Sequence, residues 1–389
     1  MKQAVIIGAG SIGRGFLGQI LTEGGYAVTF LDVNSELVEQ LNRRGSYPLE
    51  IVSTNRIERR FIGPVCAVNG NDREASARAI ADCDLCVTCV GAKAIPYIIP
   101  NLAAGVKLRF ADGGTALNLL ICENLMDADV YIRSLLETHL TVEELDTVGL
   151  VETSVGRMVP LPDKNAADPL LVRAEAYPVL PYDRDACIGE LPKAQGLIPV
   201  SPFRYVIERK LYIHNMGHAV CAYLGMRRGY ATIADAIDDP EIRLTVREAM
   251  TESAFALSKH YGKPLDELIL HTEDLIRRFG NHALGDTCAR VGNDIPRKLA
   301  KSDRLTGASL AVLGAGGHPA YIAIGAAAAL YALHPENPAL SFSALSQVTE
   351  GEYYRDTLGF YGMMRENAPL SEMRKRADEL LSARVGVVV

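Results

Sequence analysis

The stretch KQAVIIGAGSIGRGFLG, residues 2–18, decides the fold that the sequence predicts. An apolar run, typical of a buried strand, leads into glycines with the spacing G-x-G-x-x-G, and a helical pattern follows. Glycines in this position let backbone N–H groups at a helix N-terminus approach a pyrophosphate. A second predicted strand ends at Asp32, about 20 residues further on, as the dinucleotide-binding fingerprint requires. The predicted dinucleotide site consists of Gly8, Gly10, Ser11, Ile12, Gly13 and Asp32.

Asp32 favours NAD over NADP as the cofactor. A carboxylate in this place accepts hydrogen bonds from the ribose hydroxyls and repels a 2′-phosphate, and no arginine follows it immediately. Gly91 ends a further apolar run, VTCVG, and we add it to the site because ligands of doubly wound sheets bind at the carboxyl ends of the strands. Two alternatives stay open: Arg14 contacts a phosphate or is solvated, and the glycines bind a dinucleotide or form a turn without a ligand.

The first third of the chain alternates apolar runs with helical patterns, as in AVTFLDVN followed by SELVEQLNRRG. This alternation predicts an α/β fold with a doubly wound parallel sheet of the Rossmann type. Long helical patterns begin near Phe203, after a segment rich in Pro and Asp with possible strands in LLVRAEAYPVL; one of them is SLAVLGAGGHPAYIAIGAAAALYAL. We predict an NAD-binding Rossmann domain with an extension over residues 1–200, a mostly α-helical substrate domain over 201–389, and a site between them.

Composition argues against several other classes of protein. The formal net charge of −7 leaves no basic excess to meet a nucleic-acid backbone. There is no run of about 18 apolar residues that would cross a membrane, and AYIAIGAAAALYAL, residues 320–333, is interpreted as a buried helix. The N-terminal stretch has no signal-peptide cleavage pattern. We expect a cytoplasmic protein without nucleic-acid or membrane partners.

Cys83, Cys86 and Cys89 have the spacing C-x-x-C-x-x-C, which also occurs in metal and cluster sites. The surrounding DLCVTCVG is apolar and β-branched, as in a buried strand, where residues three apart point to opposite faces. We interpret the three cysteines as small buried side chains.

The stretch ERKLYIHNMGHAVCAYLG, residues 208–225, has the apolar spacing of a buried helix, although it carries several polar groups that are costly to bury. At 100° per residue, Lys210, His214, His218 and Asn215 lie near 0°, 40°, 80° and 140°, on one side of an α-helix. A solvated face is the simplest interpretation. Metal binding by His214 and His218 is a second, although no acid or cysteine stands close in the sequence. A catalytic face is the third.

The motif KLYIHNMGH, K-x-x-x-x-N-x-x-H, resembles the catalytic signature of the polyol-specific long-chain dehydrogenases, the mannitol dehydrogenase family. GAGSIGRGFLG, LLICEN and RVGNDIPRKLAKSDRL match the same family in the same order, up to about residue 310. The resemblance implies hydride transfer to NAD without a metal. It makes Lys210 the general acid and base, assigns Asn215 and Asn124 to the developing oxyanion, and gives a substrate hydroxyl to His218.

The resemblance also implies a substrate, D-mannitol 1-phosphate, oxidised with NAD to D-fructose 6-phosphate. A sugar phosphate needs cationic partners, and NDIPRKLAKSDRL offers Arg297, Lys298, Lys301 and Arg304. Arg297 and Arg304 are our candidates, because bidentate groups suit phosphate; a basic surface turn paired with Asp303 is the alternative. Two further alternatives are a related dehydrogenase acting on a free polyol or a hexuronate, and a non-catalytic NAD(H)-binding sensor. The family favours a monomer.

Overall fold

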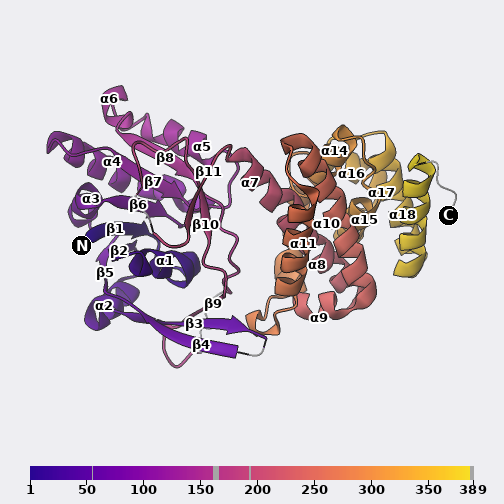
Figure 1. Cartoon of the computed structure of the whole chain (residues 1–389), viewed down its shortest axis with the longest axis horizontal. Helices are drawn as coiled ribbons and strands as arrows, with labels where there is room; N and C mark the ends of the chain where they lie inside the picture. The colour runs from indigo at the N-terminus through magenta and orange to yellow at the C-terminus, as the bar shows by residue number, and fades with distance from the viewer. Residues whose placement is uncertain (55, 161–165, 192–193, 386–389) are drawn as a thin grey trace. The chain divides into compact units, whose positions relative to one another are not determined.

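The computed structural model describes residues 1–54, 56–160, 166–191 and 194–385, and the chain divides into two compact units, Met1–Val206 and Ile207–Val389 (Figure 1). The N-terminal unit is α/β, and the C-terminal unit is built from helices in the part that the structure describes. The predicted fold class is therefore confirmed.

The N-terminal unit is built around a six-stranded parallel sheet with the strand order β5-β2-β1-β6-β7-β8. Two smaller sheets, β4-β3-β9 and β10-β11, stand beside it. The strands are β1 Lys2–Ile7, β2 Tyr26–Asp32, β3 Tyr47–Ser53, β4 Arg56–Ile62, β5 Val65–Asn69, β6 Leu85–Thr88, β7 Leu117–Ile121, β8 Val148–Glu152, β9 Val172–Glu175, β10 Leu180–Asp183 and β11 Leu197–Val200. The helical segments are η1 Gly13–Leu17, α1 Gly18–Glu23, α2 Ser35–Arg44, α3 Arg73–Asp82, η2 Ala92–Ala94, α4 Ile95–Ala111, α5 Ala128–Leu136 and α6 Val142–Leu145. Helix α7, Arg204–Arg209, begins in this unit and continues into the C-terminal unit.

Both faces of the large sheet are buried, as a doubly wound fold requires. Successive side chains of a strand point to opposite faces, so β1 contributes to two separate cores. Ala4 and Ile6 pack in the core that holds η1 and α1, whereas Val5 and Ile7 pack in the core that holds α4. The predicted strands AVTFLDVN and LNLLICEN correspond to β2 and β7. The antiparallel pair β3–β4 was not predicted.

The cysteine pattern C-x-x-C-x-x-C does not lie within one strand, because β6 spans only Leu85–Thr88. Cys86 is therefore on the strand, while Cys83 ends the preceding helix and Cys89 follows the strand. Cys83 and Cys86 are buried and Cys89 is partly buried, with its thiol donating to the carbonyl oxygen of Gly8 at 3.2 Å. The prediction of small buried side chains is thus confirmed for the first two and holds in part for the third.

The C-terminal unit is arranged around two buried helices, α8 and α15 (Figure 1). They pack closely because Gly325 on α15 lacks a side chain: a Cβ there would lie 2.4 Å from Cγ2 of Val220 on α8. The helical segments are η3 Lys210–Asn215, α8 Met216–Arg228, α9 Ile233–Asp238, α10 Pro240–Tyr261, α11 Leu265–Phe279, η4 His282–Leu284, α12 Cys288–Gly292, α13 Ile295–Leu299, α14 Thr306–Gly314, α15 Ala320–Leu333, α16 Pro338–Ser346, α17 Glu352–Arg365 and α18 Leu370–Val385.

The most apolar part of the chain, residues 320–333, is the buried helix α15, as predicted. The long helical pattern that contains it is interrupted, however. It forms two helices, α14 and α15, because Gly316 adopts a left-handed φ of 80° and Pro319 cannot continue a helix. No helix in the described part of the chain combines the length and the apolar character needed to cross a membrane.

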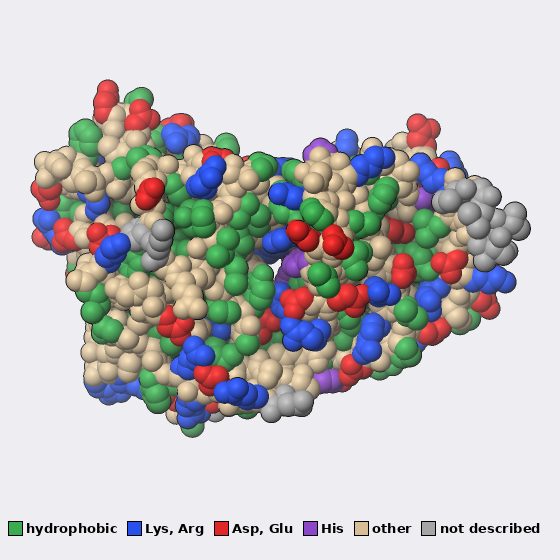
Figure 2. Space-filling model, in the orientation of Figure 1, with side chains coloured by type: hydrophobic (Ala, Val, Ile, Leu, Met, Phe, Trp, Pro, Cys, Tyr) green, Lys and Arg blue, Asp and Glu red, His purple; other side chains and the backbone are tan. Residues whose placement is uncertain are grey.

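Acidic and basic side chains are interspersed over the face of the C-terminal unit that Figure 2 shows. Several of them form surface ion pairs, such as Arg247–Glu273 at 2.5 Å and Arg243–Asp238 at 3.2 Å. Exposed pairs of this kind contribute at most about 1 kcal/mol each. We therefore attribute the stability of this unit mainly to the burial of its apolar side chains.

Glu252 on α10 makes the stability of the C-terminal unit depend on pH. Its two carboxylate oxygens accept hydrogen bonds from the backbone N–H groups of Tyr321 and Ile322, at 2.9 and 3.0 Å, at the beginning of α15. Burial nevertheless raises the pKa of Glu252 from 4.5 to about 8. The folded state then binds the proton more tightly than the unfolded state, so the free energy of unfolding falls as pH rises from about 4.5 to about 8.

We expect Glu252→Gln to reduce this loss of stability. Urea denaturation at pH 5 and pH 8 gives the change in the free energy of unfolding between these two pH values for the wild type and for the variant. This change should differ between the two proteins by up to about 1.4 kcal/mol for each unit of the pKa shift of Glu252. Comparing the two proteins cancels the contributions of all other titrating groups. Identical pH slopes for the two proteins would contradict the raised pKa.

Candidate active site

The three glycines of the loop after β1 have three different surroundings. Gly8 adopts φ 107°, a conformation that side chains disfavour, and a Cβ on Gly13 would lie 2.0 Å from the carbonyl oxygen of Gly8. Gly10 is exposed, and no heavy atom of the described residues lies within 4 Å of the position of its Cβ. Gly8 therefore makes the turn, Gly13 allows close packing, and Gly10 leaves backbone open to a ligand. Ser11 and Ile12 begin the helix that follows.

Asp32 ends β2 beside this loop. Its Oδ2 accepts a hydrogen bond from the backbone N–H of Ala9 at 2.8 Å, and its Oδ1 accepts one from Asn34 at 2.9 Å. A carboxylate has about four acceptor sites, so Asp32 retains capacity for ribose hydroxyls while it holds the glycine loop.

Arg14 is neither solvated nor exposed to the loop's open side. Its side chain is buried, with Nε donating to the carbonyl oxygen of Ala9 at 2.7 Å and Nη1 to that of Leu170 at 2.8 Å. The hydroxyl of Tyr47 donates to the backbone oxygen of Arg14 at 2.7 Å. Arg14 thus connects the glycine loop to the segment before β9, which the sequence alone did not indicate.

Gly91 and Asn124 follow β6 and β7 at the carboxyl edge of the sheet. The strand order places β1 between β2 and β6, so the order reverses at β1 and β6, where such folds bind ligands. Gly91 has φ 85° and open space around its Cβ position among the described residues, and Asn124 is exposed. Both predicted residues therefore lie at the edge where a cofactor is expected.

Glu123 precedes Asn124 in the stretch LLICEN, and the sequence analysis assigned no role to it. It is buried and accepts hydrogen bonds from the Thr88 hydroxyl at 2.7 Å and from the Val90 backbone at 3.0 Å. Burial raises its pKa despite these two donors. Glu123 thereby fixes the loop that carries Gly91.

The predicted catalytic motif lies on a helix of unusual geometry. Helical structure is continuous from Arg204 to Arg228, but Lys210–Asn215 forms a π-helical turn, η3. The spacing at 100° per residue placed Lys210 and Asn215 about 140° apart. In a π-helix residue i bonds residue i+5, so the two side chains start one turn apart on the same side of the helix. The α-helical prediction is therefore wrong here, and π-turns are frequent at functional sites.

The rings of His214 and His218 contact the ring of Phe279, the last residue of α11. The ring of His218 is stacked on Phe279, with the centroids 4.7 Å apart and an interplanar angle of 12°, and the two histidine rings are 6.1 Å apart. His214 is buried, and burial holds its pKa well below the usual value, with the positive charges of Arg278, His218 and Lys210 acting in the same direction. His214 is therefore neutral near pH 7.

An acid does stand beside the histidines. Nε2 of His218 lies 3.3 Å from Oδ2 of Asp286, and Asp286 also pairs with Arg290, whose Nη2 is 2.6 Å from its Oδ1. Burial alone would raise the pKa of Asp286, but His218 and Arg290 lower it. Sequence pattern does not predict this contact, because it joins residues far apart in the chain. Within the described ranges, no group of three or more His, Cys, Asp or Glu side chains is arranged to hold a metal ion.

The two candidate arginines of the basic turn differ in burial. Arg297 has a half-exposed side chain that pairs with Asp294 at 2.6 Å and Asp303 at 3.0 Å, as the surface-turn alternative predicts. Arg304 also pairs with Asp303, at 2.8 Å, but it is 8% exposed. Nη2 of Arg304 and the hydroxyl of Tyr223 are buried without a hydrogen-bond partner among the described residues. Unsatisfied buried donors are costly, and an anionic ligand would satisfy them.

Comparisons with known proteins find matches over most of the chain. The mannitol dehydrogenase Rossmann domain matches residues 2–192, and the mannitol dehydrogenase C-terminal domain matches residues 200–339. The mannitol-1-phosphate 5-dehydrogenase of Brevibacillus brevis is 37% identical over 86% of this chain and 87% of its own length. That of Bacillus subtilis is 34% identical over 93% and 94%. Pseudomonas fluorescens mannitol 2-dehydrogenase, solved as a ternary complex with NAD and D-mannitol, shares the fold with a TM-score of 0.74 at 16% identity, covering 97% of this chain and 94% of that one.

Proposed function

The chain belongs to the mannitol dehydrogenase family, and on this premise we propose that it is an NAD-dependent polyol-phosphate dehydrogenase. The reaction is the interconversion of D-mannitol 1-phosphate and D-fructose 6-phosphate, which is the activity named for relatives that are 33–37% identical. The observation that carries the proposal is the π-helical turn that sets Lys210 and Asn215 on one side of the helix. The open surroundings of Gly10 in the glycine loop support the proposal of a bound dinucleotide.

Bound NAD supplies the chemistry of hydride acceptance and donation. In the direction of oxidation, Lys210 accepts the proton of the reacting hydroxyl while its carbon loses the hydride, and Lys210 returns the proton in reduction. Asn215 donates a hydrogen bond to the oxygen on which negative charge develops, and we assign the same role to Asn124. His218, whose ring is stacked on Phe279 and whose Nε2 lies 3.3 Å from Asp286, hydrogen-bonds a substrate hydroxyl. No step of this proposal requires a metal ion.

The absorbance decay of NADH tests the reaction, with fructose 6-phosphate, fructose and a hexuronate as parallel substrates. We expect oxidation of NADH with the phosphate alone, at the same rate before and after treatment with EDTA. Activity on fructose or the hexuronate would retain the lysine mechanism and overturn the choice of substrate. Binding of NADH without turnover of any substrate would favour the sensor alternative, and loss of activity on chelation would overturn the metal-free mechanism.

The phosphate site is tested by a matched pair of variants, Arg304→Met and Arg297→Met. Hydrogen bonds to charged groups contribute about 1.5–3 kcal/mol, so we expect Arg304→Met to raise the KM for fructose 6-phosphate by about 10- to 100-fold. Arg297→Met should have a smaller effect, because two aspartates already occupy its donors. Thermal unfolding of both variants controls for stability. An unchanged KM in Arg304→Met would show that Arg304 does not bind the phosphate and that the basic turn has a structural role.

Asp286 is expected to act as a positioning residue for His218. Asp286→Asn keeps the shape and removes the charge, so we expect the KM for fructose 6-phosphate to rise about tenfold, or about 1.4 kcal/mol, while kcat and the affinity for NADH change less than about twofold. Asp266→Asn, on the exposed first turn of α11, is the matched control. If both kcat and the unfolding temperature of Asp286→Asn fell, the role of Asp286 would be merely structural.

A further inference from the structure

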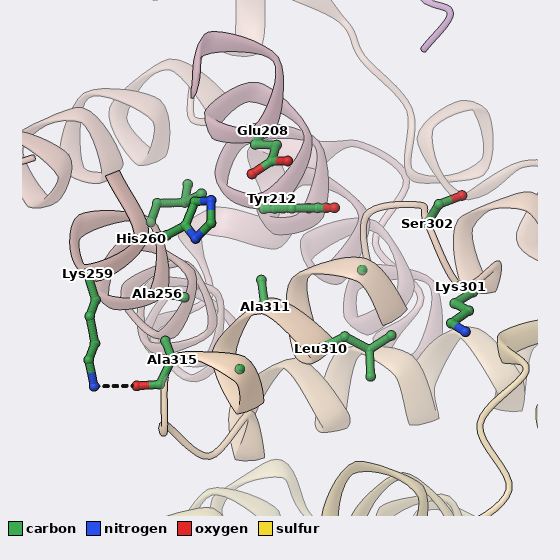
Figure 3. A pocket seen from close by; sticks show the side chains of 13 residues that line it. Glu208, Tyr212, Ala256, Lys259, His260, Lys301, Ser302, Leu310, Ala311 and Ala315 are labelled. Atoms are coloured by element: carbon green, nitrogen blue, oxygen red, sulfur yellow. Dashed lines mark hydrogen bonds between the residues drawn. The ribbon is translucent and has the colours of Figure 1, made fainter. Parts of the chain in front are cut away.

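The C-terminal unit contains a cavity that the proposed reaction does not use. Its volume is about 760 Å³, within the range of small-molecule sites, and it is open to solvent on one side. It is lined by α7, η3, the end of α10, the segment after α13, and α14 (Figure 3). Ala256 and Leu257 of α10 and Leu310 and Ala311 of α14 supply apolar walls. Lys210 and Asn215 are not among its lining residues.

The cavity owes its space to small residues on one face of α14. Gly307, Ala311 and Gly314 follow one another at helical spacing along this face. A Cβ on Gly307 would lie 2.9 Å from Cε1 of Tyr212, so this glycine lets the tyrosine ring approach α14. At the other end, no heavy atom of the described residues lies within 4 Å of the Cβ position of Gly314, so a side chain there would extend into open space.

The charges around the cavity favour an anion. Lys259 and Lys301 stand on either side of Leu310 and Ala311 in Figure 3. Lys259 uses one of its three donors on the carbonyl oxygen of Ala315, at 2.8 Å, and no ion pair engages Lys301 within the described residues. The single acid of the lining, Glu208, accepts a hydrogen bond from the hydroxyl of Tyr261 at 2.9 Å. The two ammonium groups thus outnumber the carboxylate.

The cavity shares a helical segment with the catalytic motif. Glu208 and Tyr212 line it, and they stand two positions before and two positions after Lys210 in the sequence. A ligand that moves the Tyr212 ring therefore acts on η3, the π-helical turn on which Lys210 and Asn215 share one side. Short π-helical turns interrupt the regular hydrogen bonding of a helix, which makes η3 a suitable element to transmit such a change.

We propose that this cavity is an effector site for a small organic anion with two or more phosphate or carboxylate groups. Its anionic groups pair with Lys259 and Lys301, its body lies along Ala311, and its occupation changes the turnover number through η3. The binding does not depend on the proposed dehydrogenase activity, whereas the effect on turnover rests on it. The two parts are therefore measured separately.

Binding is measured with a fluorescent reporter, since the chain contains no tryptophan. Leu310→Trp places a single tryptophan at the cavity, and Leu340→Trp, at a site that is 67% exposed, is the control. The probes are inorganic pyrophosphate and citrate, which separate phosphate from carboxylate recognition. We expect a saturable change in the emission of Leu310→Trp only, weakened at least tenfold by adding Lys301→Met and abolished by adding Gly314→Phe, which fills the cavity.

The effect on turnover is measured with NADH and fructose 6-phosphate, with and without the probe that binds. We expect kcat to change by at least twofold in the wild type, and the response to disappear in Gly314→Phe. The site is overturned if neither probe gives a saturable signal, or if the signal is equal in Leu340→Trp or survives Gly314→Phe. Binding without any change in kcat would overturn the effector role. If no dehydrogenase activity were measured, the proposed function would be overturned. The binding experiments would still test whether the cavity binds an anion.

Discussion

Replacing Lys210 with alanine is expected to lower kcat about 10²- to 10⁴-fold and to leave the affinity for NADH unchanged within about twofold. The reason is that a positioned general acid or base contributes a factor of this size to proton transfer, whereas the cofactor contacts are predicted at the glycine loop and at Asp32. The decay of NADH absorbance with fructose 6-phosphate gives kcat, and the fluorescence of bound NADH gives the affinity. Added methylamine should restore part of the rate by supplying the missing amine.

Lys375→Ala, at an exposed position of α18, is the matched control, and its kcat should equal that of the wild type. A loss of less than tenfold in Lys210→Ala would contradict the assignment. Lys298 would then be the group to examine, because burial lowers its pKa to about 8 and its ammonium lies near the ring of Tyr223. Its Nζ donates to the backbone oxygens of Val291 and Asn293, which favours a structural role for it.

The parts of the site that sequence reasoning predicted are the local ones. The conformations of Gly8, Gly10 and Gly13 follow from a strand, a turn and a helix that adjoin in the chain. The same holds for Asp32 at the end of the next strand. Such motifs can be predicted from the sequence because the groups that must meet stand close together in the chain.

Two features were beyond a reading of local pattern. The π-turn of η3 adds one residue to a helical turn, and apolar periodicity over a dozen residues does not distinguish it from an α-helix. The contacts of His218 with Phe279 and Asp286 join segments that only the packing of the C-terminal unit brings together. Phe279 and Asp286 lie in the stretch RRFGNHALGD, which has no pattern that predicts a contact with His218.

Burial of the basic turn was equally inaccessible from the sequence. Arg297 and Arg304 stand in one charged run and share Asp303, yet one side chain is half-exposed and the other is buried. The order of charges in the sequence does not encode this difference in burial. The orphaned Nη2 of Arg304, rather than the number of arginines, is what supports a phosphate site.

The second large effect is expected at the cofactor loop, from the matched variants Gly10→Ala and Gly13→Ala. A methyl group on Gly10 enters the open side of the loop and should weaken NADH binding by more than about tenfold, or about 1.4 kcal/mol, without loss of thermal stability. A methyl group on Gly13 meets the backbone oxygen of Gly8 at 2.0 Å. It should cost about 1–3 kcal/mol of stability and impair NADH binding as well, because the turn must move.

Fluorescence titration with NADH and thermal unfolding, performed on both variants and the wild type, separate the two effects. The affinity should fall in both variants, and the unfolding temperature should fall only in Gly13→Ala. Wild-type affinity in a stable Gly10→Ala would show that the pyrophosphate does not approach this loop, and the glycines would then be a turn without a ligand. Equal destabilisation of the two variants would instead contradict the open surroundings of Gly10, because only a packed glycine resists a methyl group.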